Sequence, residues 1–382
     1  MKRSTDSILT THTGRLDAPQ DLGEMTRALA RGESGDAAAH KARLRSAIGE
    51  IVREQVRTGI DVVSDGELGK FSSYSYYSKR LTGLSVRPVK PDEPPGMWER
   101  TGERIEFADF YEHLGFRTAR ERMSFTGPIS YIGGAEVRSD IESLKEAMRN
   151  VDRTEAFMCV LAPGWLEHWM YNEYYRSDEE YLFALADAMK HEYKAIVDAG
   201  FILQLDDPGL PDTYDMIVPT PSIEDYRKFA EVRVEALNHA LKGLPEDRIR
   251  YHICWGSWHG PHTHDLPLKY VVDLMLRVTA GAYSVEAANP QHEHEWKVWR
   301  DVKLPDGKIL IPGVVSHASN VVEHPELVAD RIVQYAGLVG RESVIAGTDC
   351  GMGGRVHPQI GWAKLKALVQ GAEIASKQLW GS

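Results

Sequence analysis

The chain has 382 residues, of which 42% are hydrophobic and 26% are charged, the proportions of an ordinary globular protein. A formal net charge of −11 and the lack of a basic run argue against nucleic-acid binding. No apolar stretch approaches the roughly 18 residues of a membrane span, and the N-terminus lacks the apolar core of a signal peptide. Three cysteines are too few for a disulfide framework, so we expect a cytoplasmic protein with free thiols.

Short apolar runs alternate with helical patterns along the chain. The predicted strands, in order, are residues 7–13, 61–67, 123–130, 156–164, 201–208, 248–256, 282–289, 309–319 and 343–351. Apolar spacing of i, i+3 and i+4 predicts helices over residues 40–59, 179–200 and 325–340. Eight alternating units at this length predict an α/β fold, the (β/α)8 TIM barrel. Nine strands are predicted but the barrel has only eight, so either 123–130 or 156–164 lies outside the barrel.

Residues 85–104, SVRPVKPDEPPGMWERTGER, contain four prolines and many charges. They form a long insertion after the second predicted strand, in a chain that we interpret as one catalytic domain over residues 1–382. The composition fits a lid over the barrel mouth and a solvated loop equally well.

Polar residues end seven of the predicted strands or follow them directly. They are His12, Glu67, Asp206, Cys254, Glu286, His317 and Cys350. In a TIM barrel these strand ends converge on one face, and that face carries the active site. A single polar residue at such a position is usually a helix cap or a turn residue. Seven of them, from seven different strands, predict a shared site.

The segment RYHICWGSWHG places His252 and Cys254 two residues apart on one predicted strand. Successive side chains of a strand alternate between its faces, so both residues point the same way. Imidazole nitrogen and thiolate sulfur are ligands that zinc prefers. Glu286 and Cys350, at the ends of later strands, complete a candidate set of four. Cys159 is left out, because a thiol within a continuous apolar run usually behaves as a small hydrophobe.

Four protein ligands would close a structural zinc site, whereas a catalytic site keeps one position open. A carboxylate holds zinc less firmly than a thiolate does, so Glu286 is the ligand expected to yield. A thiol that replaced it would be deprotonated by the metal. This set of ligands therefore predicts alkyl transfer to sulfur rather than hydrolysis.

Seven segments, in order along nearly the whole chain, resemble the cobalamin-independent methionine synthases, in particular their C-terminal catalytic barrel and shorter single-barrel relatives. The segments are TTHTGRLDAP, DVVSDGELGKF, LQLDDPGL, YHICWG, YSVEAANP, PGVVSHASN and AGTDCG. The resemblance implies that His317 is the proton donor, and that Glu67 and Asp206 contact the amino acid acceptor, homocysteine. It also implies the four zinc ligands: His252, Cys254, Glu286 and Cys350.

Two departures from the family pattern concern the substrates. The family's barrel begins with a Gly-Ser pair whose serine helps to hold the acceptor's carboxylate, whereas this chain has Gly14 and Arg15. Arg15 either offers a bidentate fork to an anionic tail or turns outward to solvent. The tryptophan on which the family packs folate is not found in TGPISYIGGAE, which leaves folate in doubt as the donor. The candidate substrate-binding residues are His12, Arg15, Glu67 and Asp206.

Residues 254–276 and 286–296 are closer to a branch of the family that includes epoxyalkane:coenzyme M transferase. Three interpretations therefore stand. The first is a zinc-dependent thiol alkyltransferase that moves a methyl or other alkyl group onto a thiolate such as that of homocysteine. The second is opening of an epoxide by a zinc-bound thiol, and the third is a non-catalytic zinc-binding barrel. The expected partners are a small-molecule thiol and an alkyl donor, either folate or an epoxide. We expect no binding to nucleic acid or membrane, and the sequence does not decide whether the protein forms a homo-oligomer.

Overall fold

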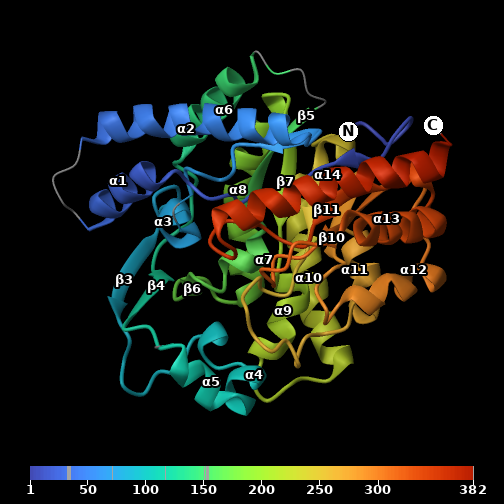
Figure 1. Cartoon of the computed structure of the whole chain (residues 1–382). Coiled ribbons are helices and arrows are strands. Elements are labelled where there is room, and N and C mark those ends of the chain that lie inside the picture. Colours follow the sequence, from blue (N-terminus) through green and yellow to red (C-terminus); the bar gives the residue numbers. More distant parts are fainter. Residues whose placement is uncertain (32–35, 71, 117, 150, 152–154, 382) are drawn as a thin grey trace.

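Eight parallel strands form a barrel with helices around it (Figure 1). The computed structural model describes residues 1–381 apart from 32–35, 71, 117, 150 and 152–154. The strands follow the spatial order β1-β11-β10-β9-β8-β7-β5-β2. β1 and β2 close the ring, because the Asp61 backbone N–H donates to Thr10 O at 3.1 Å. The predicted TIM barrel is confirmed. The strands are β1 (Leu9–Thr10), β2 (Val62–Ser64), β5 (Glu155–Leu161), β7 (Ile202–Asp206), β8 (Ile249–His252), β9 (Ala282–Glu286), β10 (Ile309–Val315) and β11 (Ile345–Thr348).

Of the nine predicted strands, residues 123–130 lie outside the barrel, and residues 156–164 supply its third strand. β4 (Glu121–Phe125) pairs with β3 (Leu84–Pro88) and β6 (Tyr171–Asn172) in a separate three-stranded sheet. This sheet lies beside the barrel, and α4 (Gly102–Glu106) and α5 (Ala108–His113) follow at the end of the molecule where α9 (Gly209–Met216) lies (Figure 1). The proline-rich segment 85–104 thus runs through β3, η1 (Met97–Glu99) and the start of α4.

Helices on the outside of the barrel bury their apolar faces against the strands. The three helices expected from the sequence are α2 (Ala37–Thr58), α8 (Asp178–Asp198) and α13 (Pro325–Val339). Capping explains where α8 begins, since Ser177 Oγ accepts a hydrogen bond from Glu180 N at 3.1 Å. The other helices are α1 (Gln20–Ala30), α3 (Ser73–Ser78), α6 (Gly134–Met148), α7 (Pro163–Leu166), α10 (Ile223–Leu241), α11 (Val272–Leu276), α12 (Val298–Asp301) and α14 (Pro358–Trp380), with short 3-10 turns η2 (Glu246–Arg248), η3 (Leu268–Tyr270), η4 (Glu293–Lys297) and η5 (Arg341–Ser343).

None of the described helices is both long enough and apolar enough to cross a membrane.

The barrel interior is layered. Apolar side chains fill the amino-terminal layer: Val62, Phe157, Ile202, Ala282, Ile309, Ile311 and Ile345. Above them lies a polar layer around Arg250, which is 2% exposed. The guanidinium donates to Gln204 Oε1 at 2.6 Å and to Thr11 Oγ1 at 2.9 Å, and its Cζ lies 3.5 Å from the centre of the Phe157 ring. This layer supports the strand ends that carry the candidate site.

Candidate metal centre and active site

Three predicted metal ligands meet at the carboxyl ends of β8 and β11. The ligand atoms of His252, Cys254 and Cys350 all lie within 4.8 Å of one another. The two Sγ atoms are 3.9 Å apart. The sequence prediction that both His252 and Cys254 lie on one strand needs a correction, because β8 ends at His252 and Cys254 follows two residues later. Both side chains nevertheless line the same cavity, as the alternation rule predicted.

The chemistry of these three residues fits a metal ion. His252 is 2% exposed, and its Nδ1 lies 3.1 Å from Ser284 Oγ. Its other ring nitrogen, Nε2, has no hydrogen-bond partner among the described residues. A histidine held at one nitrogen and left with a lone pair at the other is the usual arrangement of a metal ligand. The hydrogen bond from Cys254 lowers the pKa of Cys350 well below its usual value, against the effect of burial, so one thiolate is available.

Glu286, the fourth predicted ligand, stands apart from that group of three. Its Oε1 accepts from Trp255 N at 3.1 Å and its Oε2 from Asn289 Nδ2 at 3.0 Å. It belongs to a second group of ligand atoms within 4.8 Å of one another, together with His317 and Asp349. The structure therefore places Glu286 at the expected strand end, with its carboxylate bound to neighbouring N–H groups.

His317 is fully enclosed beside Glu286 and Asp349. Its side chain is 1% exposed, and neither ring nitrogen has a hydrogen-bond partner in the described part of the chain. Asp349 Oδ1 accepts from Ala287 N at 2.7 Å, whereas its Oδ2 also has no partner there. Burial raises the pKa of Asp349 well above its usual value, with the charge of Glu286 as a further cause. The group thus places an imidazole beside a carboxyl that favours its protonated form.

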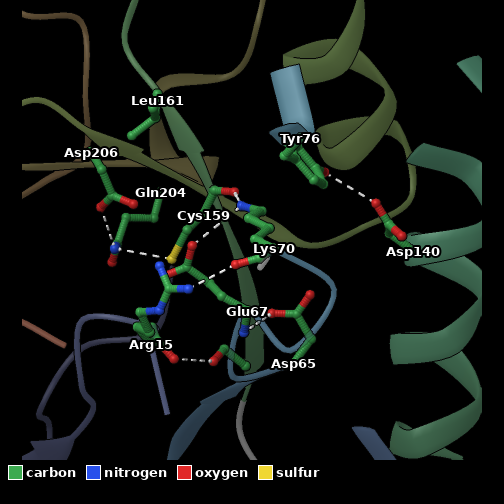
Figure 2. Close-up of polar contacts among 12 residues, drawn as sticks. Arg15, Asp65, Glu67, Lys70, Tyr76, Asp140, Cys159, Leu161, Gln204 and Asp206 are labelled. Atoms are coloured by element: carbon green, nitrogen blue, oxygen red, sulfur yellow. Dashed lines mark hydrogen bonds and ion pairs between the residues drawn. The ribbon is translucent and has the colours of Figure 1, made fainter. Parts of the chain in front are cut away.

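A third group of ligand atoms joins Glu67, Cys159 and Asp206 (Figure 2), and Asp206 on β7 is paired in register with His252 on β8. Burial raises the pKa of Asp206 to about 7, and the nearby charge of Glu67 adds to the effect. Lys70 balances part of this charge, since its Nζ lies 3.6 Å from Glu67 Oε2. Gln204 Nε2 donates to Asp206 Oδ1 at 2.6 Å. Glu67 and Asp206 thus form an acidic recess in the cavity wall, with Lys70 beside it.

The turn after β1 brings Arg15 to this recess. Arg15 Nη2 donates to Lys70 O at 2.8 Å, and Arg15 lines the cavity (Figure 2). The turn needs glycine at position 14, where φ is +113° and a Cβ atom would lie 2.3 Å from Cys159 Sγ. A side chain at position 14 would clash with Cys159, so glycine is what lets the backbone of this turn pass beside the recess.

His12 stabilises that turn through hydrogen bonds of both ring nitrogens. Its Nδ1 accepts from Gly14 N at 3.1 Å, so its Nε2 donates to Gln55 Oε1 at 2.8 Å. Burial lowers the pKa of His12 to about 4, so the ring is neutral at physiological pH. His12 is not among the described residues that line the cavity, unlike the other predicted substrate-binding residues, Arg15, Glu67 and Asp206.

A cavity of about 340 Å³ connects the group of His252, Cys254 and Cys350 with the recess, whereas the predicted residues Glu286 and His317 are not among the described residues that line it. One end is lined by His252, Cys254, Cys350, Glu67 and Asp206. The other end is lined by residues that the sequence analysis did not single out: Trp98, Arg104, Phe116, Trp165, Trp169 and Trp258. The only signal for them in the sequence is the density of tryptophan in segments that follow strands, such as WLEHW over residues 165–169.

The fold and the site define a class: a TIM barrel with cysteine and histidine side chains that could hold a metal ion at the carboxyl ends of its strands. No protein-family model matches the chain. The methionine synthase of Thermococcus kodakarensis is 24% identical over 342 residues, covering 88% of this chain and 84% of that protein. The methionine synthase of Sulfurisphaera tokodaii is 23% identical over 376 residues, covering 97% and 93%.

Among solved structures, a B12-independent methionine synthase from Shewanella sp. W3-18-1, in complex with selenomethionine, superposes with a TM-score of 0.74. It is 20% identical and covers 98% of this chain and 100% of that one. The resemblance to methionine synthases that the sequence segments predicted is confirmed over nearly the whole chain, and the fold matches that of a B12-independent methionine synthase. The comparisons do not single out the epoxyalkane:coenzyme M transferase branch.

Proposed function

We propose that the protein is a zinc-dependent thiol alkyltransferase that moves a methyl or other alkyl group onto a thiol such as homocysteine. The observation that carries this proposal is the meeting of His252, Cys254 and Cys350 in a cavity that Glu67 and Asp206 also line. A thiol amino acid can present its sulfur to the first group and its ammonium to the second. The methionine synthases to which the chain is related perform a reaction of this class.

Zinc is the metal that this donor set favours, since it takes both thiolate sulfur and imidazole nitrogen. Glu286 is proposed as its fourth ligand. When bound, zinc lowers the pKa of a thiol and so supplies a thiolate at neutral pH. The hydrogen bonds that Trp255 N and Asn289 Nδ2 give to Glu286 offer its carboxylate an alternative to the metal, which suits a ligand that yields to substrate.

The side chains of the recess would bind the acceptor. Glu67 and Asp206 supply negative charge for an ammonium group, and Arg15 at the same recess supplies positive charge for a carboxylate or sulfonate. His12 takes no direct part in this proposal, because its ring nitrogens hold Gly14 N and Gln55. It shapes the turn that carries Arg15.

His317 is proposed to supply the proton that the leaving group needs. Its ring nitrogens have no competing partner within the described residues, so either one can carry a proton toward the reacting atoms. The carboxyl groups of Glu286 and Asp349 lie beside it.

The proline-rich segment is proposed to act as a lid rather than as a solvated loop. Trp98 and Arg104, which both lie within residues 85–104, line the cavity. Closing the cavity around the substrates keeps water away from the reacting thiol and orients both reactants.

The test is a product assay with zinc-loaded protein in two arms. One arm contains methyltetrahydrofolate and homocysteine, and the other contains epoxypropane and a small thiol, with thioether formation measured by mass spectrometry. Methionine above the enzyme-free rate supports methyl transfer, and a hydroxyalkyl thioether supports epoxide opening. Absence of any thioether in both arms, with zinc content intact and no response of the metal centre to added thiol, would identify a non-catalytic barrel.

A further inference from the structure

A buried arginine lies one layer below the strand ends that carry the candidate site. Arg250 precedes His252 by two residues on β8, so both side chains point into the barrel, and Arg250 is 2% exposed. In the described part of the chain, no carboxylate forms an ion pair with Arg250. Its N–H groups donate instead to neutral oxygens of Gln204, Thr11 and His12. A buried cation is costly unless its surroundings compensate for the lost water, so its charge is stabilised through these neutral groups.

Only one orientation of the Gln204 amide satisfies its neighbours. A guanidinium group has donors and no acceptor, so the amide oxygen Oε1 faces Arg250, whose Nε donates to it at 2.6 Å. The amide nitrogen Nε2 then faces the recess and donates to Asp206 Oδ1 at 2.6 Å (Figure 2). A reversed amide would set its nitrogen against the guanidinium and its oxygen against the carboxylate. Arg250 thus fixes which end of Gln204 points toward the recess.

Gln204 connects a buried positive charge with a negative one. The hydrogen bonds from Arg250 to Gln204 and from Gln204 to Asp206 are both 2.6 Å long, and each involves a charged group. Hydrogen bonds to ionised groups are stronger than neutral ones, and bonds in series strengthen one another where the dielectric is low. Gln204 is 0% exposed, which places the bonds in such surroundings. The three side chains therefore form an ion pair bridged by an amide.

The bridge holds one oxygen of Asp206 and leaves the other available. Gln204 Nε2 also donates to Thr13 O at 2.9 Å and lies 3.2 Å from Cys159 Sγ, a weak acceptor. Its two hydrogens thus go to the carboxylate and the carbonyl oxygen, which keeps the amide from rotating. Asp206 Oδ2 forms no hydrogen bond within the described residues, and Asp206 lines the cavity. A ligand in the cavity can therefore bind to Oδ2.

The two carboxylates of the recess differ in their neighbours. Lys70 Nζ lies 3.6 Å from Glu67 Oε2, so Glu67 has a cation beside it. No cation forms an ion pair with Asp206 in the part of the chain that the structure describes, and its hydrogen-bond partner Gln204 is neutral. Asp206 is therefore the better placed of the two to bind a cationic group of a ligand.

We propose that Arg250 and Gln204 are positioning residues for the acceptor, and that Asp206, held by this bridge, binds the ammonium group of an amino acid thiol. The inference rests on the proposed function, in which the recess binds the acceptor. Arg250 and Gln204 act through Asp206, because neither is among the described residues that line the cavity. A thiol without an ammonium group gains nothing from the bridge.

The test compares two thiols that differ only in an ammonium group, homocysteine and 4-mercaptobutanoate. Isothermal titration calorimetry measures the affinity of each for zinc-loaded protein. Both thiols carry the same sulfur and carboxylate groups, so the ratio of their affinities reports on the ammonium contact alone. We expect homocysteine to bind about ten- to a hundredfold more tightly, the effect of a hydrogen bond to a charged group.

Gln204→Met keeps the size of the side chain and removes both ends of the bridge. The ratio should fall close to one, while the affinity for 4-mercaptobutanoate stays unchanged. Arg250→Lys keeps the buried charge but not the planar fork that reaches three acceptors, so the ratio should fall partway. The matched control, Tyr283→Phe on the neighbouring strand β9, removes the buried hydrogen bond to Val278 O and should keep the ratio whole.

Asp206→Asn separates positioning from general damage to the barrel. This variant should bring the ratio close to one by itself, and adding Gln204→Met to it should change the ratio no further. Damage to the core would instead weaken the binding of both thiols by the same factor. That result in Gln204→Met, or a ratio that Gln204→Met leaves unchanged, would overturn the proposal.

Equal affinity of the unaltered protein for the two thiols would also overturn it, and this result needs no variant to fold. The number of sulfur ligands at zinc, measured by X-ray absorption, reports separately on the proposed function. If neither thiol adds a sulfur ligand while the Gln204-dependent preference remains, the positioning role stands and the acceptor is not a thiol.

Discussion

Cys254 and Cys350 are 96 residues apart in the chain, yet their Sγ atoms lie 3.9 Å apart. Strands β9 and β10 separate β8 from β11 in the barrel, so the two thiols meet only because the carboxyl ends of parallel strands converge. A disulfide requires a sulfur–sulfur distance of about 2.05 Å. The observed spacing instead leaves room for a shared ion, with His252 Nε2 as the third donor.

The Cys350→Ala variant is expected to lose zinc. Removing a thiolate ligand should weaken zinc binding by more than the roughly 10- to 100-fold that follows from loss of a residue that only orients a ligand. Metal content after purification without chelator, measured by plasma mass spectrometry, tests this. Cys159→Ala is the matched control, because Cys159 belongs to the separate group with Glu67 and Asp206 and should leave zinc content unchanged. Full zinc content in Cys350→Ala would exclude the proposed ligand set.

The His317→Asn variant is expected to lose rate and keep its metal. General acid catalysis typically contributes about 10²–10⁴-fold, so turnover with a fixed thiol and donor should fall on that scale. Zinc content should remain whole, because His317 lies in the group with Glu286 and Asp349 rather than with the two cysteines. His113→Asn, at an exposed position of α5, serves as the control. Loss of zinc from His317→Asn would reassign the residue as a ligand.

Arg15 is expected to select thiols with an anionic tail. The comparison uses Arg15→Ser with 3-mercaptopropionate and 2-mercaptoethanesulfonate, which are anionic, and with 2-mercaptoethanol, which is neutral. Loss of a hydrogen bond to a charged group costs about 1.5–3 kcal/mol, or roughly one to two decades in affinity. The anionic thiols alone should weaken by that amount. A variant that weakens every thiol equally, or none, would show that Arg15 recognises no anion.

Lys364 is expected to hold the loop that carries His317. Its side chain is 0% exposed, and its Nζ lies 2.9 Å from Glu323 Oε2. Glu323 Oε1 in turn accepts from Ser316 N at 2.8 Å. Removing one partner of a buried pair typically costs about 3–5 kcal/mol. Lys364→Met should therefore lower the free energy of urea unfolding on that scale. Lys366→Met, exposed on the same helix, should change it little, and equal effects of the two variants would argue against the pair's role.

Stability is expected to fall at alkaline pH because of two buried histidines that share Asp265. Burial lowers the pKa of His262 and of His292, but hydrogen bonds to Asp265 more than offset it and raise the values to about 9 and about 10. An unfolded histidine titrates near 6.5. Because the folded protein binds these two protons more tightly than the unfolded chain does, protonation of the two histidines stabilises the fold fully below about pH 6.5. This stabilisation is lost as the pH rises through about 9 to 10.

Denaturant unfolding of the metal-free protein between pH 6 and pH 10 measures this loss. The free energy of unfolding should decline across that window in the unaltered protein, and the decline should be shallower in His292→Gln. His239→Gln changes a partly exposed histidine on α10 and should keep the original slope. Identical slopes for the unaltered protein and His292→Gln would contradict the assignment of the proton to this network.

The barrel and the convergence of His252, Cys254 and Cys350 can be predicted from the sequence because they depend on periodic patterns. Apolar strand runs alternate with amphipathic helices, and strand ends of a closed parallel barrel must meet whatever the loops do. Glu286 marks the limit of this reasoning. Its strand end is predicted correctly, but the direction of its carboxylate is set by hydrogen bonds from Trp255 N and Asn289 Nδ2.

Residues that reach the cavity from loops escape prediction altogether. Arg104 in α4 and Trp258 in the segment after β8 have no periodic signal, and their meeting is a tertiary contact between segments far apart in the sequence. The place of residues 123–130 in a second sheet could not be predicted either. Their apolar run looks like that of residues 156–164, and only the pairing with β3, a tertiary contact, separates the two. His12 has the strand-end position of a site residue, but Gly14 N and Gln55 use both of its ring nitrogens.

The central claim is that a thiol substrate reaches a zinc ion held by Cys254 and Cys350. X-ray absorption at the zinc K-edge, with and without saturating homocysteine or 2-mercaptoethanesulfonate, tests it most directly. The account predicts that one thiol raises the number of sulfur ligands from two to three, each at about 2.3 Å, while a nitrogen or oxygen ligand is lost. A sulfur count that stays at two with both thiols at saturation would contradict the account.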